Sequence, residues 1–340
     1  MSRRKIVVTG ASGFTGLHAC SHLERLGYEV VAVLRRPGAM DSILASTADG
    51  GDVIREHVID LNDRTAVIEL LDRERPDALL HMAGLNAVGG SWEQPVAYMQ
   101  LNVMATLYLL DGLRLLGLTR CRTLIAGSML GCRLRDDEPP RPAHPYGLSK
   151  TLQTLTASAW GHLFGLPVCI AQPSNLIGPG ASNGICGLIG AHVAKREQEG
   201  EAPPFRLTSL EEPRDYIDVR DTVRAYGLIL ERGEPGGVYP IGSGKVRTLG
   251  GIAREFERQA RVKMEWRIGT TADLIGEQLP VRLSGLADPE DERLGAGASA
   301  VDLGPMRSLD WAPELAFDQS VADILDYHRQ AGQIKGKEGG

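Results

Sequence analysis

Short apolar runs alternate with helical periodicity through the first half of the chain. Short apolar runs, most of them with β-branched residues, cover positions 5–9, 28–34, 53–59, 78–82 and 122–126, and each has the length of a buried strand. Between them, apolar residues recur at helical spacing from 14 to 26, from 94 to 116 and from 145 to 164. Strands that alternate with helices form parallel sheets covered on both faces, so the pattern predicts an α/β fold of the Rossmann, doubly wound type.

The alternation ends after the apolar run at positions 168–171. Glycine- and proline-rich segments with short strands follow, and helical patterns recur at 254–261 and 320–330. We therefore expect a larger domain over residues 1–172 and a smaller α+β domain over residues 173–331, from which a segment at about 214–242 returns to the first. The polar, glycine-rich residues 332–340 favour a flexible tail.

The composition narrows the class of ligand. Of the 340 residues, 43% are hydrophobic and 24% charged, and the formal net charge is -6, which disfavours nucleic acid but allows a small anionic ligand. Five cysteines without a CxxC pair indicate free thiols in a reducing compartment rather than disulfides or a metal site. The sequence shows no signal peptide and no apolar stretch that could span a membrane, so we expect a cytoplasmic protein.

Three glycines follow the first predicted strand at a spacing of three residues. Gly10, Gly13 and Gly16 lie between that strand and a helical pattern, which is the context of a dinucleotide site. Glycine lets the chain turn sharply and lets a pyrophosphate approach backbone N–H groups at the positive end of a helix. A tight turn without a ligand is the alternative, although it does not require this spacing. The predicted phosphate site comprises Gly10, Ser12, Gly13, Phe14, Thr15 and Gly16.

Two arginines end the second predicted strand. An acidic residue there binds the ribose hydroxyls of NAD, whereas this chain has Arg35 and Arg36. A guanidinium group pairs bidentately with phosphate, so the two arginines favour the 2'-phosphate of NADP over NAD. Surface arginines at a strand end are common, and one alone would indicate little.

A tyrosine and a lysine four residues apart begin the long helix predicted at 145–164. This spacing places Tyr146 and Lys150 on one helix face. An ammonium about 4 Å from a phenol contributes roughly 4 kcal/mol at an effective dielectric near 20, which would bring the phenol pKa from about 10 to near 7. Tyr146 is therefore a candidate general acid or base, although such pairs also occur on ordinary helix surfaces.

Ser128 follows the strand at 122–126, on the sheet edge where ligands bind an open α/β fold. Its hydroxyl is suited to donate to a substrate oxygen beside Tyr146, and a strand-end serine without that role is the alternative. The glycine turn, Ser128 and the Tyr-x-x-x-Lys pair together resemble the short-chain dehydrogenase/reductase family. The resemblance implies further cofactor contacts at Asp60, Leu61, Ala83, Gly84, Asn102 and Pro173.

Two later segments resemble the extended, sugar-nucleotide-modifying branch of that family. Residues 172–180 are similar to its Arg-Pro-x-Asn-x-x-Gly-Pro-Gly signature, with Gln172 in place of arginine, and residues 214–221 are similar to its Arg-Asp-Phe/Tyr block. Segments at 33–36, 218–226, 288–293 and 322–329 resemble the GDP-4-keto-6-deoxymannose reductases. The resemblance implies a nucleotide-diphosphate sugar bound by Asn175, Arg214 and Arg293, and a homodimer formed through the helices at 94–116 and 145–164.

The residues after Ser128 bear on the reaction. Family dehydratases carry an Asp-Glu pair there, whereas Met129 and Leu130 cannot transfer protons. Reduction of a keto-sugar by NADPH requires only Ser128, Tyr146 and Lys150, and we expect this reaction. Epimerisation needs the same residues and remains an alternative. A non-catalytic NADP sensor or RNA-binding protein is an alternative of another class, which the intact Tyr146 and Lys150 and the acidic charge disfavour.

Overall fold

The structure is a computed structural model that describes residues 3–37, 54–132, 139–200, 202–269 and 300–338. For residues 333–338 it describes the backbone alone. The chain divides into two compact units. The first comprises Met1–Pro173, Val223–Ile241 and Gly304–Ala312, and the second comprises Ser174–Thr222, Gly242–Leu303 and Pro313–Gly340.

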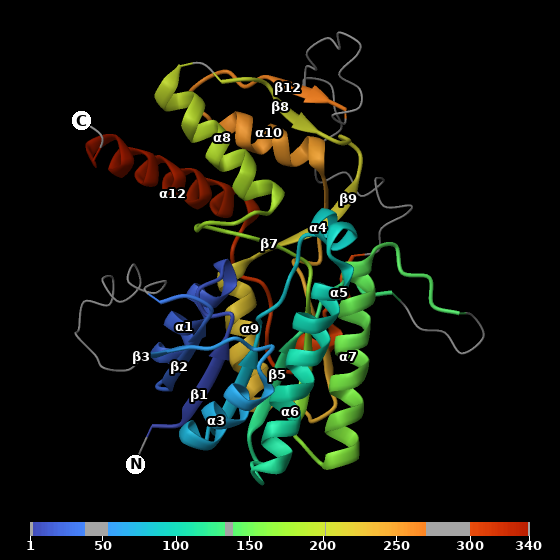
Figure 1. Ribbon diagram of the computed structural model, residues 1–340. Coiled ribbons are helices and arrows are strands. Elements are labelled where there is room, and N and C mark those ends of the chain that lie inside the picture. The colour runs from blue at the N-terminus through green and yellow to red at the C-terminus, as the bar shows by residue number, and fades with distance from the viewer. Residues whose placement is uncertain (1–2, 38–53, 133–138, 201, 270–299, 339–340) are drawn as a thin grey trace. The chain divides into compact units, whose positions relative to one another are not determined.

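A parallel sheet forms the centre of the first unit (Figure 1). Its strands are β1 (Lys5–Thr9), β2 (Glu29–Leu34), β3 (Ile54–Val58), β4 (Ala78–His81), β5 (Arg122–Ala126), β6 (Val168–Pro173) and β10 (Val238–Ile241). Within the described residues it has seven strands in the order β10-β6-β5-β4-β1-β2-β3, and each pair is parallel. The strand order reverses between β1 and β4, which is the point where such sheets bind ligands. The predicted Rossmann fold is confirmed.

Helices flank this sheet (Figure 1). They are α1 (Phe14–Arg25), α3 (Arg64–Glu74), α4 (Val88–Glu93), α5 (Pro95–Tyr98), α6 (Ala105–Leu115), α7 (Pro145–Phe164), α9 (Val219–Arg232) and α11 (Gly304–Arg307). Residues 94–116, predicted as one helix, contain a π-helical segment, η1 (Met99–Met104), between α5 and α6. The wider turn coincides with Asn102, whose carbonyl accepts a hydrogen bond of 2.8 Å from the Thr106 hydroxyl.

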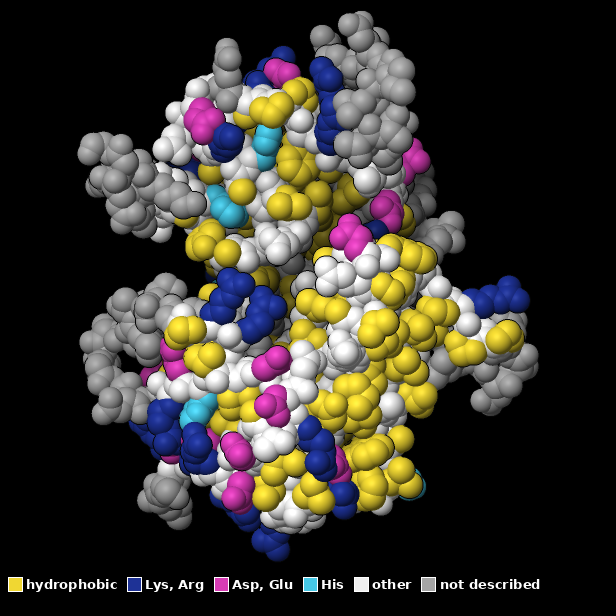
Figure 2. Space-filling view, in the orientation of Figure 1, with side chains coloured by type: hydrophobic (Ala, Val, Ile, Leu, Met, Phe, Trp, Pro, Cys, Tyr) yellow, Lys and Arg dark blue, Asp and Glu magenta, His cyan; other side chains and the backbone are white. Residues whose placement is uncertain are grey.

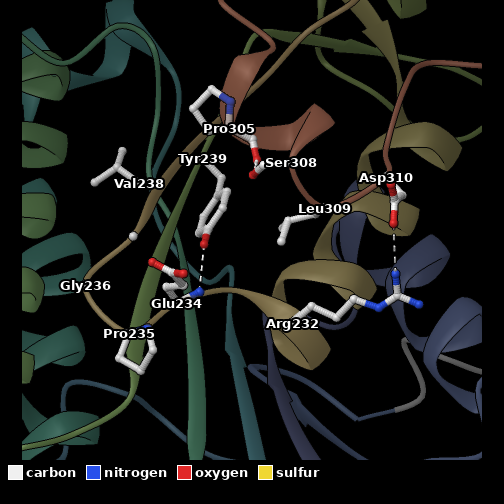
Figure 3. A pocket seen from close by; sticks show the side chains of 11 residues that line it. Arg232, Glu234, Pro235, Gly236, Val238, Tyr239, Pro305, Ser308, Leu309 and Asp310 are labelled. Atoms are coloured by element: carbon white, nitrogen blue, oxygen red, sulfur yellow. Dashed lines mark hydrogen bonds and ion pairs between the residues drawn. The ribbon is translucent and has the colours of Figure 1, made fainter.

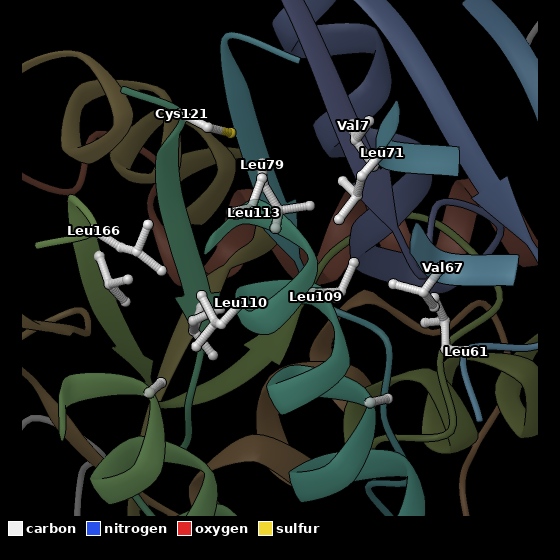
Figure 4. Packing of buried hydrophobic residues seen from close by; sticks show 14 of the residues in the cluster. Val7, Leu61, Val67, Leu71, Leu79, Leu109, Leu110, Leu113, Cys121 and Leu166 are labelled. Atoms are coloured by element: carbon white, nitrogen blue, oxygen red, sulfur yellow. The ribbon is translucent and has the colours of Figure 1, made fainter. Parts of the chain in front are cut away.

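Aliphatic side chains from strands and helices fill the core of the first unit (Figure 4). Val7 of β1 and Leu79 of β4 lie in one buried cluster with Leu71 of α3 and with Leu109 and Leu113 of α6. Each of these side chains is at most 1% exposed. The strands that precede the site residues are therefore anchored by packing on the helices.

A buried ion cluster lies at the β3 edge of the sheet. Glu74, at the end of α3, has a side chain only 4% exposed, and it lies 3.1 Å from Lys5 Nζ, 2.9 Å from an Arg55 nitrogen and 3.1 Å from His57 Nε2. Burial alone would raise the pKa of this carboxyl, but the surrounding basic groups hold it below its ordinary value.

Within the described residues, two small sheets and three helices build the second unit. A three-stranded sheet has the order β11 (Val246–Thr248), β9 (Pro213–Asp218), β7 (Asn175–Ile177), and β8 (Phe205–Leu207) pairs with β12 (Trp266–Ile268) in the described part of the chain. The helices are α8 (Ile185–Glu199), α10 (Leu249–Gln259) and α12 (Phe317–Glu338). The patterns at 254–261 and 320–330 thus belong to helices that begin earlier. Residues 332–338, from the expected flexible tail, continue α12 through Glu338.

The cysteines and the helix lengths complete the description. All five cysteines are free, as predicted, and all but Cys132 are buried. In the residues that the structure describes, no helix is both long enough and apolar enough to cross a membrane.

Candidate active site

The glycine turn leads from β1 into α1. Gly10 has a φ of 72°, and a Cβ there would lie 2.8 Å from the Ala83 backbone nitrogen. A Cβ at Gly16 would overlap the Gly10 carbonyl oxygen. Gly13 precedes the first residue of α1 and offers no capping side chain, so the N–H groups of the first helical turn have no such acceptor. This geometry fits an anion such as a pyrophosphate.

The other residues of the turn follow the same arrangement. Ser12 and Gly13 are exposed, whereas Phe14 and Thr15 are half-buried in the first turn of α1. Their backbone N–H groups lie at the helix N-terminus, where a bound phosphate is favoured.

Arg35 and Arg36 lie immediately after β2 and are exposed. Among the described residues, neither guanidinium group forms an ion pair or a hydrogen bond. The two side chains are therefore available to an anionic group near the carboxyl ends of β1 and β2, where the glycine turn also begins.

Asp60 and Leu61 follow β3 and have different environments. The Asp60 carboxylate accepts hydrogen bonds from the Asn62 backbone, at 2.9 Å, and side chain, at 3.1 Å, so it shapes the turn before α3. The cap of α3 is Asp63. The Leu61 side chain packs in the hydrophobic core, so only its backbone can reach a ligand.

Tyr146 and Ser128 meet beside the start of α7. His144 caps this helix by accepting a 2.8 Å hydrogen bond from the Gly147 N–H. Its ring stacks against that of Tyr146 with centroids 5.9 Å apart, and Tyr98 approaches edge-on at 6.3 Å. The phenol is buried, and the half-buried Ser128 hydroxyl lies close enough to act on its pKa. The roles predicted for this serine and tyrosine in a reaction stay predictions.

The structure contradicts the expected lowering of the tyrosine pKa. Burial raises the pKa of Tyr146 above its ordinary value by more than the neighbouring Ser128 hydroxyl lowers it, and Tyr98 raises it further. The Lys150 ammonium is directed elsewhere, since Nζ donates to the Ala126 carbonyl at 2.8 Å and to Gln153 Oε1 at 2.9 Å. The phenol is therefore protonated at neutral pH.

Lys150 is itself buried, and burial lowers its pKa to about 8. A Cβ at Gly84 would lie 3.8 Å from Lys150 Nζ and 2.7 Å from Asn102 Oδ1. The turn that contains Ala83 and Gly84 therefore comes against α7, and the absence of a side chain at Gly84 leaves room beside the ammonium.

Asn102 and Pro173 have structural partners. The Asn102 amide donates to Leu85 O at 3.0 Å and to Ser149 Oγ at 2.9 Å, and its oxygen accepts from Leu85 N at 2.8 Å. Asn102 thereby ties the turn after β4 to α7. Pro173 ends β6, and its carbonyl accepts from the Met129 N–H at 3.4 Å. Direct contacts of the two residues with a cofactor stay predictions.

The predicted substrate residues Asn175 and Arg214 lie on neighbouring strands of the second unit, β7 and β9. Asn175 Nδ2 donates to the Asp215 carbonyl at 2.9 Å. Arg214 forms an ion pair with Glu212 and has a side chain 40% exposed. Arg293 lies outside the described residues.

One pocket of the first unit lies apart from all of these residues (Figure 3). It encloses about 720 Å³ between the end of α9, β10 and α11. Arg232 and Asp310 form an ion pair of 3.7 Å at its rim, and the Tyr239 hydroxyl accepts from the Glu234 N–H at 2.8 Å. None of the predicted site residues lines it.

Several buried polar residues near the lysine or linked to it were not predicted as site residues from the sequence, namely Thr9, His81, Thr106, Ser149 and Gln153. One signal was present, because a residue three positions after Lys150 lies on the same helix face. The others come from separate elements, and only the folded arrangement brings them together.

Comparisons with known proteins identify the family of the chain. Residues 6–242 match the description "NAD dependent epimerase/dehydratase family". A GDP-6-deoxy-D-mannose reductase of Pseudomonas aeruginosa is 27% identical over 330 residues, which cover 95% of this chain and 96% of the relative. A UDP-glucose 4-epimerase of Azospirillum brasilense is 26% identical over 98% of this chain and 95% of its own.

Solved structures show the same fold. RMD from Pseudomonas aeruginosa complexed with NADPH superposes with a TM-score of 0.74 at 23% identity, over 96% of this chain and 99% of the other. The UDP-glucose 4-epimerase of Thermus thermophilus in complex with NAD gives the same values. The family match spans well over half of the chain and includes the positions of the glycine turn, Ser128 and the Tyr-x-x-x-Lys pair. The chain belongs to the NAD-dependent epimerase/dehydratase family, the extended branch of the short-chain dehydrogenases/reductases that its motifs resemble.

Proposed function

We propose that this protein uses NADPH to reduce the keto group of a nucleotide-linked 4-keto-6-deoxy sugar. The observation that carries the proposal is a buried, protonated phenol, Tyr146, beside the Ser128 hydroxyl, with no second acid or base in the two positions after that serine. Such a site can deliver one proton and one hydrogen bond to a carbonyl oxygen.

Each residue of the site has its own role in the proposed reduction. When bound, NADPH supplies the hydride for the carbonyl carbon. Ser128 donates a hydrogen bond to the carbonyl oxygen, and Tyr146 transfers its proton to that oxygen, so the ketone becomes a secondary alcohol. The raised pKa of Tyr146 keeps the phenol in the form that a proton donor needs.

The side chains after Ser128 disfavour dehydration. Met129 is 44% exposed and Leu130 is 43% exposed, and neither can accept or donate the proton that elimination of water requires. Reductases need no such pair, so the composition of this segment agrees with the proposed reaction.

The cofactor would be held by residues of the first unit. The glycine turn and the N-terminus of α1 would bind the pyrophosphate, Arg35 and Arg36 would bind the 2'-phosphate, and Lys150 would contact the ribose beside Gly84. The described geometry fits this group, since the arginines are exposed after β2 and a Cβ at Gly84 would lie 3.8 Å from Lys150 Nζ. Relatives of known structure contain either NADPH or NAD, so the preference for NADP rests on the two arginines.

An epimerase with a retained cofactor is the second candidate. A UDP-glucose 4-epimerase is 26% identical over 98% of this chain, and epimerisation through a transient keto-sugar uses the same three catalytic residues. A non-catalytic NADP sensor or RNA-binding protein is less compatible with an intact Ser128, Tyr146 and Lys150.

A labelled hydride distinguishes these functions. The protein is incubated with NADPH deuterated at the transferred position and with GDP-, dTDP-, UDP- and CDP-linked 4-keto-6-deoxy sugars, and the products are analysed by mass spectrometry. The proposal predicts an alcohol that retains the deuterium for at least one nucleotide. The proposal would be refuted if no deuterated alcohol formed with any of the nucleotides, so that wild type and Tyr146→Phe gave the same products.

We also propose a homodimer formed through the helical face of the first unit. Apolar side chains gather over α5, α6 and α7 (Figure 2). Exposed members on α4 to α7 and η1 include Trp92, Val96, Met104, Leu115, Leu155 and Leu163, each between 39% and 67% exposed. An apolar surface of this kind is typical of an interface between copies.

A further inference from the structure

A chain of buried polar side chains runs from the catalytic lysine through the core of the first unit. Lys150 Nζ donates to Gln153 Oε1 at 2.9 Å, Gln153 Nε2 donates to Thr106 Oγ1 at 2.9 Å, and Thr106 Oγ1 lies 2.9 Å from His81 Nε2. His81 Nδ1 lies 2.7 Å from Thr9 Oγ1. The five side chains come from α7, α6, β4 and β1, and none is more than 6% exposed.

The charge of the lysine sets the direction of each hydrogen bond near it. An ammonium group only donates, so the carbonyl end of the Gln153 amide must face Lys150 and the NH2 end must face Thr106. Thr106 has one hydroxyl proton, which it donates to the Asn102 carbonyl at 2.8 Å. The Thr106 oxygen therefore accepts from both Gln153 and His81.

The same reasoning assigns the tautomer of the histidine. Because His81 donates from Nε2 to Thr106, its Nδ1 is the acceptor of the Thr9 hydroxyl proton. The Thr9 oxygen in turn accepts from the Ala83 N–H at 3.3 Å. Burial, and then the charge of Lys150, lower the pKa of His81 to about 3, so the ring is neutral as this assignment requires. In this assignment each hydrogen bond along the chain pairs one donor with one acceptor.

We propose that Gln153 is a positioning residue for Lys150: its carbonyl oxygen holds the buried ammonium in the charged form beside Gly84, and its amide group links that ammonium through Thr106 and His81 to Thr9, which precedes the phosphate-binding turn. The inference rests on the proposed function in one respect, because it is the catalytic use of Lys150 that gives the position its importance.

The surroundings of the lysine explain why a glutamine is needed. Among the described residues, the titratable group that the charge of Lys150 acts on is the neutral His81 of β4. Tyr146, one turn earlier on α7, contacts Tyr98 of α5. Within the described residues, no carboxylate forms an ion pair with Lys150. Burial already lowers the pKa of this lysine to about 8, and the ammonium is stabilised by two carbonyl oxygens, those of Ala126 and Gln153. An apolar residue at 153 would remove one of the two.

Direct titration of the lysine tests this role without any requirement for activity. The full chain is labelled with [ε-13C]lysine, and the Lys150 signal is identified by its loss in Lys150→Met. In Gln153→Met, which is similar in size but has no acceptor, the Lys150 pKa is expected to fall by about one unit, the effect of one hydrogen bond to a charged group. In Gln153→Glu, a carboxylate faces the ammonium and the pKa is expected to rise.

Two further variants complete the test. Thr156→Val is the control on the same helix, because the Thr156 hydroxyl bonds only to the carbonyls of Leu152 and Gln153, and it is expected to leave the Lys150 pKa unchanged. Thr106→Val removes the acceptor that orients the Gln153 amide and is expected to lower the pKa by less than Gln153→Met. This variant and Gln153→Glu carry the test if Gln153→Met does not fold.

The outcomes separate the two proposals. The positioning role is supported if the Lys150 pKa falls in Gln153→Met, rises in Gln153→Glu and stays unchanged in Thr156→Val. If these shifts are found but no keto-sugar is reduced, only the proposed function fails. If the enzyme is active, the alkaline limb of kcat/KM is expected to move with the Lys150 pKa. Equal Lys150 pKa values in wild type, Gln153→Glu and Thr106→Val would overturn the inference.

Discussion

Removal of the two arginines after β2 is predicted to change the cofactor preference. Arg35 and Arg36 are exposed and, among the described residues, have no ion pair, so the double variant Arg35→Ala/Arg36→Ala leaves no buried charge without a partner. We expect its thermal unfolding to be unchanged, because surface substitutions of this kind alter stability by about 0.5 kcal/mol or less. Any loss of NADPH binding then reports the loss of contacts with the cofactor.

The size of the effect follows from the exposure of these side chains. A hydrogen bond to a charged group contributes about 1.5 to 3 kcal/mol, and solvent exposure reduces an ion pair to about 1 kcal/mol or less. We take about 1 kcal/mol for each arginine, so the two together contribute about 2 kcal/mol, or roughly a 30-fold change in the Kd of NADPH. NADH lacks the 2'-phosphate, and its Kd is expected to change little.

The assay measures the Kd of NADPH and of NADH by titration of cofactor fluorescence. Each single variant is compared with Arg73→Ala, which removes an exposed arginine from α3 and thus controls for net charge. The Kd of NADPH divided by the Kd of NADH is compared between the double variant and wild type. If this ratio rises by less than about tenfold, the assignment of these arginines to the 2'-phosphate is wrong.

Three other predictions concern the substrate, the stability and the assembly. Arg214→Ala is expected to weaken the binding of a nucleoside diphosphate in calorimetry with GDP, dTDP and UDP while the affinity for NADPH stays the same, and equal affinity for every nucleotide would remove Arg214 from the site. The pKa of Glu74 is lowered in the folded chain, so its contribution to stability is present above the unfolded pKa and lost as the pH falls through the folded one. Glu74→Gln is therefore expected to destabilise the protein at pH 7 and to flatten the acid side of the stability profile, and a profile parallel to wild type would contradict this. Leu155→Glu places a charge on the exposed face of α7 and is expected to convert a dimer to a monomer in light scattering, whereas a wild-type mass would count against that face.

Strong local signals allowed the sequence to predict the main elements. The strand at 5–9 and the helix at 145–164 were predicted with the bounds that the structure has. Gly10, with a φ of 72°, ends the first, and Gly165, with a φ of 64°, follows the second in the left-handed conformation that glycine adopts readily. Residues whose conformation depends on their neighbours in sequence are those that a pattern predicts well.

Features that depend on distant contacts were not predicted. The π-helical turn at 99–104 coincides with Asn102, whose side chain bonds to the turn after β4 and to α7, and nothing in its helical periodicity indicates this. The pKa of Tyr146 is raised rather than lowered, because burial and Tyr98 act on it more than a lysine that faces Ala126 and Gln153. Spacing places two side chains on one face of a helix, but it does not indicate which partner each one chooses.

The most direct test of the proposed function is the stoichiometry of cofactor and sugar. Purified protein is mixed with NADPH and a nucleotide-linked 4-keto-6-deoxy sugar, NADPH is followed by its near-ultraviolet absorbance, and the sugar is quantified by chromatography. The proposed reduction predicts one NADPH oxidised for each sugar converted. Conversion of the sugar at constant NADPH absorbance would show a retained, recycled cofactor and would contradict the proposal in favour of an epimerase.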